Sequence, residues 1–282
     1  MITDATAAPT LAVSIVLYES ALDRLELTLR SLSESLEYAL QQGALARASV
    51  CVVDNASCDA YRKALKNLMH TVMSDPLPRV HWDIVYGERN VGFGAGHNQA
   101  LGSRESDYYL VLNPDVELAG TAIAQALAAL RDTEVVAINP LSRRADGNRE
   151  YLCKRYPSVF TLFLRGFIGG RGGRWFAPRL ARYEYRDRSE TEAWPARLLS
   201  GACLVCRGPA FRAVGGFDPR FFMYFEDFDL SRRLASSGKL MFEPSVEIVH
   251  HGGNAARKGR RHIRMFLSSA RRFFSRHGWR WV

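Results

Sequence analysis

The sequence has few cysteines, no long apolar run and no recognisable leader. Its five cysteines are an odd number for a chain of 282 residues, which argues against a disulfide framework and favours a reducing compartment. The best apolar run, Val159 to Ile168, is interrupted by Arg165 and is shorter than the roughly 18 residues that span a bilayer. The first ten residues lack the basic start and apolar core of a signal peptide. We therefore expect a cytoplasmic protein, or one attached to a membrane surface.

A zinc site is also not indicated. Cys203 and Cys206 form a Cys-x-x-Cys motif, but the sequence has no second pair to complete four ligands. We interpret both as small apolar residues of a strand. Hydrophobic residues make up 47% of the chain, which is enough for a buried core, and the length suits one α/β domain with elaborations or two small domains.

Acidic residues are missing from the end of the chain. From His251 to Val282 there are nine Lys and Arg and no Asp or Glu, so this segment holds the whole net charge of +9. A basic end of this kind indicates an anionic partner such as phosphate, lipid headgroups or nucleic acid. No nucleic-acid-binding motif accompanies it, so we expect no nucleic-acid partner.

Buried strands alternate with amphipathic helices along the chain. Apolar runs predict strands at 11–17, 49–53, 81–86, 108–112, 135–138, 197–206 and 246–249. Helical patterns follow at 22–36, from about residue 97, and at 121–131, 208–213 and 222–235. This alternation predicts an α/β fold with a largely parallel sheet. Residues 142–196, rich in Arg, Gly and aromatics, are expected to form a long mobile excursion over the site.

Three polar clusters follow strands in the first half of the chain: Asp54–Ser57, Asn90–Asn98 and Asn113–Asp115. Open parallel sheets bind ligands at the carboxyl ends of their strands. Each cluster alone also suits a simple turn, because Asn, Asp, Gly and Pro dominate turns. Their repetition at equivalent strand ends favours a binding site.

The third cluster is the candidate diphosphate and metal site. Mg²⁺ and Mn²⁺ prefer oxygen ligands, and a diphosphate site often supplies only one or two carboxylates. Asp115 fits that role, and Asn113 is placed to assist it. His250, just after a predicted strand, is a candidate second ligand as a neutral imidazole. A proline turn with a capping Asp and a structural histidine remain the alternatives.

The Glu226-Asp227 pair is the candidate general base. It lies among aromatic residues, and burial there raises the pKa of a carboxylate and makes it a better base. The alternative is that acids at the start of a helix interact with its dipole. Both interpretations can hold together.

The glycine-rich cluster is a candidate ligand contact. Gly92 and Gly94 begin a G-x-G-x-G series that matches neither the dinucleotide fingerprint nor the phosphate-binding loop. Glycine permits close approach of the backbone to a ligand. We expect these glycines and Phe93 to contact the donor, with Asn90 and Asn98 as side-chain hydrogen-bond donors.

Taken together, the motifs resemble those of inverting family 2 glycosyltransferases, in the rhamnosyltransferase-like branch of bacterial surface-polysaccharide synthesis. The resemblance runs from about Val13 to His277 and is weak at 142–196. It is carried by VSIVLYES, VVDNAS, NVGFGAGHNQAL, YYLVLNPDV, LLSGACLVCRGPAFRAVGGFDPRFFMYFEDFDLSRRL and VHHGG. Each motif is modest alone, whereas the ordered set is specific.

The resemblance implies a GT-A type, Rossmann-like mixed sheet flanked by helices over residues 11–253. Residues 11–140 form the expected nucleotide-sugar-binding half and 197–253 the acceptor-binding and catalytic half. The segment 142–196 is a loop-rich insertion between them, and 254–282 form a basic amphipathic C-terminal helix.

The family pattern also assigns roles to individual residues. It implies that the nucleotide base and ribose are held by Tyr18, Glu19, Asp54 and Asn55. Its Asp-x-Asp metal motif corresponds to Asn113-Pro114-Asp115, which leaves Asp115 as the main carboxylate. His250 resembles the late histidine that reaches the metal, although His251 is an alternative.

The catalytic half follows the same pattern. Asp227 resembles the catalytic base with Glu226 beside it, and Gly201 resembles the segment that lines the donor sugar and acceptor. The implied reaction is a single in-line displacement that inverts the anomeric carbon, supported by Mg²⁺ or Mn²⁺. The implied donor is a dTDP or UDP sugar, with dTDP-L-rhamnose as the best guess, and the acceptor a saccharide or polyprenyl-diphosphate-linked saccharide.

The tail suggests an attachment to the inner membrane. Its apolar residues lie near one helical face and its arginines elsewhere, as in helices that bind anionic membranes. The alternative is a packed C-terminal helix with a solvated basic face. Two other functions are weighed: a sugar-nucleotide nucleotidyltransferase, disfavoured because Tyr18-Glu19-Ser20 stands where a glycine-rich basic loop is expected, and a non-catalytic binder of anionic polymers.

Overall fold

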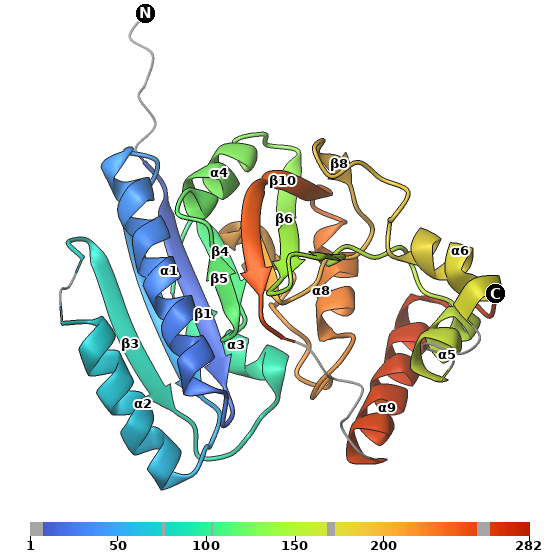
Figure 1. Ribbon diagram of the computed structural model, residues 1–282, viewed down its shortest axis with the longest axis horizontal. Helices are drawn as coiled ribbons and strands as arrows, with labels where there is room; N and C mark the ends of the chain where they lie inside the picture. The colour runs from blue at the N-terminus through green and yellow to red at the C-terminus, as the bar shows by residue number, and fades with distance from the viewer. Residues whose placement is uncertain (1–7, 75–76, 103, 168–172, 253–259) are drawn as a thin grey trace, which may run out of the picture.

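The computed structural model describes residues 8–74, 77–102, 104–167, 173–252 and 260–282. A central mixed sheet is covered by helices on both faces, and a smaller group of helices lies at one side (Figure 1). The strands are β1 Thr10–Leu17, β2 Arg47–Asp54, β3 Val80–Tyr86, β4 Tyr108–Leu112, β5 Val116–Leu118, β6 Val135–Arg144, β7 Arg149–Glu150, β8 Trp194–Pro195, β9 Cys203–Arg207 and β10 Lys239–His250. The helices are α1 Leu22–Gln41, α2 Asp59–Val72, α3 Phe93–Leu101, α4 Ala122–Ala129, α5 Val159–Phe167, α6 Gly173–Tyr183, α7 Gly208–Ala213, α8 Glu226–Leu234 and α9 Arg260–His277.

The sheet runs in the order β3-β2-β1-β4-β9-β6-β10-β5, with β7 on β6 and β8 on β10. Its first four strands are parallel, and β9 joins antiparallel between β4 and β6. The expected α/β class and mixed, helix-flanked sheet are confirmed.

Alternation along β1 shows how the sheet divides two apolar layers. Val13 and Ile15 face the layer formed with the leucines of α1 and with α2 and α4, whereas Ala12 and Val16 face the layer formed with α3, α7 and α8. All four side chains are buried, because a parallel strand covered on both faces favours apolar residues on both sides. The run 11–17 is accordingly apolar except for Ser14, whose buried hydroxyl is hydrogen-bonded to His97 Nδ1.

Several predicted boundaries differ from the structure. Helix α3 begins at Phe93 instead of near His97, so Gly94 and Gly96 lie inside its first two turns and Gly92 immediately precedes it. Strand β9 begins at Cys203 instead of residue 197, because Leu198 bridges to Lys154 and Gly201–Ala202 form a turn. The short strand β5 and helix α2 were not expected. Cys203 and Cys206 are buried free thiols in β9, which confirms their interpretation.

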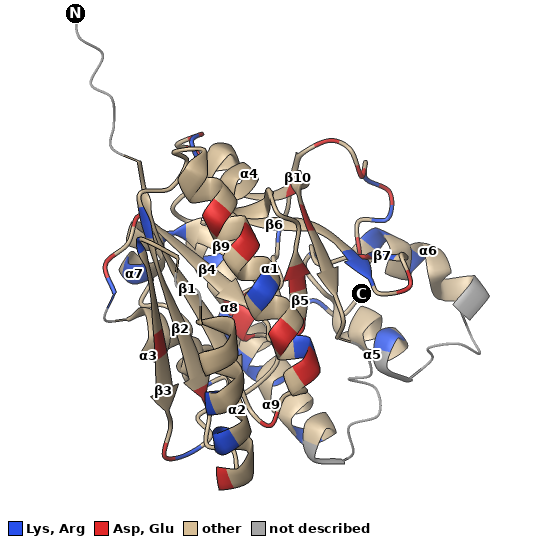
Figure 2. Cartoon of the chain, turned by 60° about the vertical axis from the view of Figure 1, so that its left-hand side comes forward, with Lys and Arg blue, Asp and Glu red and all other residues tan. Residues whose placement is uncertain are grey.

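The insertion 142–196 is more regular than expected. It contains β7, α5, α6 and β8, and α5 and α6 pack beside α9 at one side of the molecule (Figure 1). Its basic residues on α5 and α6 lie near the C-terminus (Figure 2). Part of this insertion lines the pocket described below, as expected of a segment over the site.

The C-terminal helix α9 is largely a packed helix. Ala270, Phe273 and Phe274 are buried with Phe221 and Phe225 in a third apolar cluster. Among the described residues, no helix combines the length and apolarity needed to cross a bilayer. Of the face expected to meet a membrane, only Ile263 and Leu267 are well exposed.

Candidate active site

The pairing of β5 with the end of β10 brings two distant motifs together. His250 is opposite Val116 in this antiparallel ladder, next to Asp115. The His250 Nε2 atom lies 3.4 Å from Asp115 Oδ1 and 3.5 Å from the Asn113 side-chain nitrogen. The structure therefore assembles Asn113, Asp115 and His250, as the sequence predicted.

His251 points elsewhere. Its Nε2 lies 3.0 Å from a carboxylate oxygen of Glu117, and its Nδ1 lies 3.2 Å from the Arg24 guanidinium. Of the two neighbouring histidines, His250 is therefore the one that faces Asp115.

The Asp115–His250 pair fits a divalent cation. Asp115 Oδ1 is buried and accepts no hydrogen bond within the described chain. A Cβ atom added at Gly252 would lie 2.6 Å from His250 Nε2 and 2.8 Å from Asp115 Oδ2, so glycine leaves the space between them open. No group of three His, Cys, Asp or Glu side chains is arranged for a metal in the described ranges, which leaves diphosphate and water as the remaining ligands.

Glu150 contacts the other ring nitrogen of His250, and no motif in the sequence marks it. Its Oε2 lies 2.7 Å from His250 Nδ1 and also accepts a hydrogen bond from the Ser142 hydroxyl. Such a carboxylate fixes the ring orientation of a metal-binding histidine. Burial lowers the pKa of His250, but its contacts with the Asp115 and Glu150 carboxylates outweigh burial and raise the pKa to about 9.

The acid pair begins helix α8 after a strained turn. Tyr224 and Phe225, immediately before Glu226, have φ angles of 72° and 65°, a left-handed conformation that aromatic residues rarely adopt. Packing holds this turn, because Phe225 contacts Phe266 and Phe273 of α9. The strained backbone of this turn therefore sets the position of the two carboxylates that follow it.

Backbone donors orient Asp227. One carboxylate oxygen accepts a hydrogen bond from the Phe228 N–H at 2.8 Å and the other from the Gly201 N–H at 3.1 Å. A Cβ atom at Gly201 would lie 2.9 Å from the Phe93 ring, so this glycine allows the loop to approach both residues. Gly201, Phe93 and Asp227 are thereby placed together, as expected.

The two acids differ in surroundings. Glu226 is 6% exposed, and its Oε2 lacks a hydrogen-bond partner among the described residues. Burial, together with the charge of Asp227, raises the pKa of Glu226 well above its usual value, and burial also raises the pKa of Asp227, against the opposing effect of the Gly201 and Phe228 N–H groups. We infer that a proton shared by the pair resides on Glu226 and the charge on Asp227.

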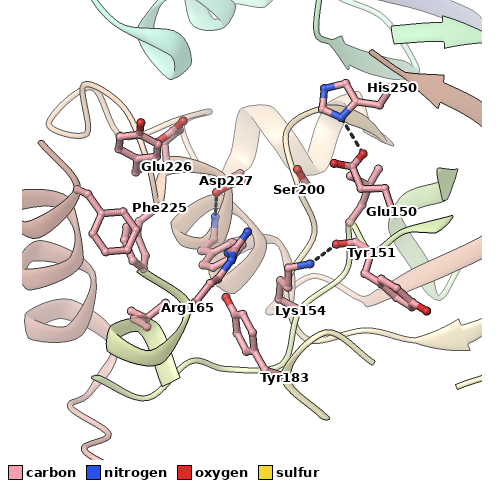
Figure 3. Close-up of a pocket in the computed structure, with 15 residues that line it drawn as sticks. Glu150, Tyr151, Lys154, Arg165, Tyr183, Ser200, Phe225, Glu226, Asp227 and His250 are labelled. Atoms are coloured by element: carbon pink, nitrogen blue, oxygen red, sulfur yellow. Dashed lines mark hydrogen bonds and ion pairs between the residues drawn. The ribbon is translucent and has the colours of Figure 1, made fainter. Parts of the chain in front are cut away.

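The acid pair and His250 line one pocket. Its volume is about 240 Å³, and its lining includes Asp227, Ser200, Glu150 and His250. Figure 3 shows Asp227 near the centre of the view and the Glu150–His250 pair to one side, with Ser200 between them. The candidate base and the histidine of the candidate cation site thus border the same space, which suits sugar transfer.

Lys154, Arg165 and Tyr183 also line this pocket, and the sequence did not identify them. All three come from the insertion, where no motif marks them. Lys154 is held in place by backbone hydrogen bonds with Leu198 in both directions.

The glycine cluster has a different role from the expected one. A Cβ atom at Gly92 would lie 2.2 Å from the Phe222 carbonyl oxygen, and one at Gly94 would lie 2.7 Å from Phe217. The close approach is therefore to the protein's own chain, and it fixes α3 against the segment that precedes the acid pair. The Phe93 N–H donates to the Phe222 carbonyl at 3.0 Å, which completes this contact.

The asparagines nearby also bind the protein. Asn98 forms two hydrogen bonds with the backbone of Phe217. Asn90 Oδ1 accepts from the Gly92 N–H and from the Asn55 side chain. Asn55 is 3% exposed, so Asn55 and Asn98 hold the loops together instead of facing a ligand. The side-chain nitrogen of Asn90 takes part in neither of these bonds, and its contact with a ligand stays a prediction.

Of the strand-end residues expected to bind the base and ribose, some are buried in the protein and others are exposed. Asp54 is fully buried and forms an ion pair with Arg62 at 2.6 Å, so its carboxylate does not face the site. Tyr18 is 56% exposed, and Glu19 is exposed with a left-handed φ of 48°. Tyr18 and Glu19 remain available for a nucleotide, and their contact with it stays a prediction.

Comparison with known proteins identifies relatives of this chain. The family described as Glycosyl transferase family 2 matches residues 13–215. The chain is 32% identical to N-acetylglucosaminyl-diphospho-decaprenol L-rhamnosyltransferase of Mycobacterium tuberculosis over 216 residues, covering 72% of this chain and 66% of that protein. It is 27% identical to rhamnosyltransferase WbbL of Escherichia coli, covering 57% of this chain and 61% of that protein. The chain thus spans less than two thirds of each of these relatives.

Solved structures share the fold. GalNAc-T7 with UDP, GalNAc and Mn²⁺ superimposes with a TM-score of 0.62 at 16% identity, covering 88% of this chain and 44% of that one. The mannosyltransferase PcManGT of Pyrobaculum calidifontis, in complex with GDP-Man and Mn²⁺, gives 0.60 at 19% identity, covering 89% and 59%.

Proposed function

This chain belongs to glycosyltransferase family 2, and from that premise we propose that it transfers a sugar from a nucleoside diphosphate to a saccharide acceptor with inversion at the anomeric carbon. The observation that carries the proposal is the shared pocket, into which Asp227 and the His250 end of the Asp115–His250 pair both open.

The residues divide the work. Asp227, oriented by Gly201 and Phe228, accepts the proton of the acceptor hydroxyl as that oxygen attacks the anomeric carbon. The bond from this carbon to the diphosphate breaks on the opposite side. Asp115 and His250 would hold a divalent cation, which would supply positive charge to the departing diphosphate. Mn²⁺ in structures that share the fold supports this assignment.

A single substitution tests the base. We expect Asp227→Asn to lower kcat by about 10²–10⁴-fold, the usual contribution of a general base, while the dissociation constant for the nucleoside diphosphate changes little. Asp23→Asn, another acid in the first turn of a helix, serves as the control and should keep full activity. Undiminished transfer in a folded Asp227→Asn enzyme would refute the proposal.

We further propose dTDP-L-rhamnose as the donor and a lipid-linked saccharide as the acceptor. Two relatives named as rhamnosyltransferases support this, one of them named for a diphospho-decaprenol substrate. A thermal-shift panel of dTDP and UDP sugars with Mg²⁺ or Mn²⁺ tests the donor, since a ligand at 100 times its dissociation constant stabilises by about 2.7 kcal/mol. A larger shift with another sugar nucleotide would exclude rhamnose.

A lipid-linked acceptor favours attachment to a membrane. We propose that the exposed Ile263 and Leu267 of α9 contact the bilayer, with Arg264 and Arg271 beside them on the exposed surface facing anionic headgroups. The other apolar residues of this helix are packed in the protein, so attachment rests on a small patch.

A further inference from the structure

The pocket contains positive charge that the transfer chemistry does not use. Lys154 is 6% exposed, and its Nζ donates one hydrogen bond, to the Tyr151 carbonyl. In the described part of the chain, the acids of the insertion pair with other residues, as in Arg155–Asp187, Arg186–Glu184 and Arg149–Glu190. Neither Lys154 nor Arg165 forms an ion pair there.

These two cations lie close enough to affect each other. Burial, followed by the charge of Arg165, lowers the pKa of Lys154 to about 8, against the opposing effect of Glu184 and Glu150. Holding like charges together in a partly dehydrated space costs free energy. Two ammonium donors of Lys154 are left for an anion, together with the guanidinium donors of Arg165 that its contact with Tyr183 does not use.

The position of the pair within the pocket identifies which anion it meets. Figure 3 shows Lys154, Arg165 and Tyr183 on the side of Asp227 away from Glu226, with His250 and Glu150 farther along the pocket. The donor diphosphate is assigned to Asp115 and His250. An anion at Lys154 and Arg165 is therefore attached to the molecule whose hydroxyl meets Asp227, which is the acceptor.

The walls around the pair suit an acceptor with an apolar chain. The pocket is also lined by Leu162 of α5, Phe228 of α8 and Phe266 of α9. Two of these three helices, α5 and α9, also carry the exposed apolar residues Phe163, Ile263 and Leu267. A chain leaving the pocket between them reaches the patch assigned to the membrane.

We propose that Lys154 and Arg165 form a subsite for the diphosphate of a lipid-linked acceptor, and that the prenyl chain leaves over Leu162 and Phe266. This inference rests on the proposed function, because it assumes that Asp227 is the base. It adds a recognition element supplied by the insertion, which places the acceptor sugar by its phosphate end.

Two acceptors with the same sugar test the subsite. One is N-acetylglucosamine linked to a short prenyl diphosphate, and the other is octyl N-acetylglucosaminide, which carries no phosphate. We expect Arg165→Gln and Lys154→Gln each to raise KM for the diphosphate acceptor about tenfold or more, the loss expected for a charge-assisted hydrogen bond. KM for the neutral glycoside should change less than twofold.

Controls separate this role from others. Arg188→Gln removes an exposed charge of the same insertion and should alter neither KM. Because Lys154 is buried and its loss can weaken folding, the exposed Arg165 provides the second variant. An equal loss of kcat with both acceptors and a shifted pH profile would show that the cations only tune Asp227, and a raised KM for the nucleotide sugar would assign them to the donor; either result overturns the proposal.

Direct binding keeps the test independent of turnover. We expect titration calorimetry without donor to show that both variants bind the diphosphate acceptor more weakly than the wild type does. Binding of the neutral glycoside should be unchanged. If the wild-type enzyme transfers sugar to neither acceptor, the proposed function fails, whereas unchanged binding of the diphosphate compound in the variants overturns the subsite.

Discussion

At the scale of single residues, two adjacent carboxylates are given opposite tasks by their surroundings. Asp227 has two N–H donors that favour its charged form, whereas Glu226 is buried with an unpartnered oxygen. A raised pKa means that folding favours the protonated acid. Its stabilising effect is complete below the unfolded pKa, near 4.5 for Glu226, and is lost as the pH rises toward the folded pKa.

This sign gives a stability prediction. We expect the melting temperature of Glu226→Gln to equal that of the wild type near pH 4 and to exceed it at pH 7. The reason is that glutamine, unlike Glu226, takes up no proton on folding. Each unit by which the Glu226 pKa is raised corresponds to about 1.4 kcal/mol at neutral pH. Thermal melts from pH 4 to pH 8 measure it, with the exposed Glu192→Gln as control. A variant less stable than the wild type at pH 7 would contradict the assignment of the proton to Glu226.

Glu150 gives a second prediction at this scale. Removing the carboxylate in Glu150→Ala should weaken Mn²⁺ binding about 10–100-fold, because the His250 ring loses the group that fixes its orientation. Calorimetric titration with Mn²⁺ in the presence of a nucleoside diphosphate provides the measurement. Glu117→Ala, which removes the equivalent partner of His251, should bind Mn²⁺ like the wild type. Equal weakening in both variants would argue against His250 as the ligand.

The limits of the sequence are visible at these same residues. Asp115, His250 and Asp227 stand beside recognisable turns or strand ends, so their residue types and order indicated a site. Glu150, Lys154 and Arg165 lie in a segment without a motif. Glu150 is placed by the β6–β7 hairpin and Lys154 by its bridge to Leu198, and no sequence pattern marks either contact. Asn98 and Gly92 misled because the same residue types serve ligand loops and close chain packing.

At the scale of elements, α8 and α9 are joined through a buried charge. Asp229 of α8 is fully buried and is 2.8 Å from Arg233 of its own helix and from His277 of α9, and 3.1 Å from Arg276. The same contact surface holds Phe225 in the strained turn before Glu226. Helix α9 therefore supports the catalytic turn as well as covering the core.

Breaking this link should destabilise the protein strongly. We expect Asp229→Asn to lower the free energy of unfolding by about 3 kcal/mol, because it leaves buried cations without their counter-charge. Glu26→Gln, in the exposed i,i+4 pair with Arg30, should cost less than about 0.5 kcal/mol. Denaturant unfolding of both variants measures the difference. Similar small losses would show that apolar packing alone holds α9.

Element positions were predictable where a pattern spans a whole strand or helix. The runs at 11–17 and 108–112 matched β1 and β4 closely, because strands buried on both faces are almost entirely apolar. The short strand β5 escaped prediction, since its three residues form a strand only by pairing with β10. That pairing is what brings Asp115 to His250.

At the scale of the whole molecule, the basic tail is partly neutralised from within. Arg276 pairs with Asp218 and Asp229, and Arg272 lies over the Phe221 ring and donates to the Arg220 carbonyl. The nine basic residues of the tail therefore overstate the charge that the tail offers to a partner. The exposed Arg264 and Arg271 remain for a surface, beside Ile263 and Leu267.

The patch on α9 leads to the last prediction. Removing the whole tail would also remove Phe273 and Phe274 from the core, so the substitutions must be confined to the surface. We expect Ile263→Ser with Leu267→Ser to weaken binding to anionic phospholipid vesicles about tenfold or more, given the apolar area that each side chain can bury, with melting unchanged. Leu27→Ser with Tyr38→Ser makes the same kind of change on α1, on the other side of the molecule (Figure 1), and should bind like the wild type. If binding falls equally in the two double variants, or persists in the α9 double variant, α9 is not the membrane contact. Any remaining affinity is then electrostatic, and about 0.5 M salt should abolish it.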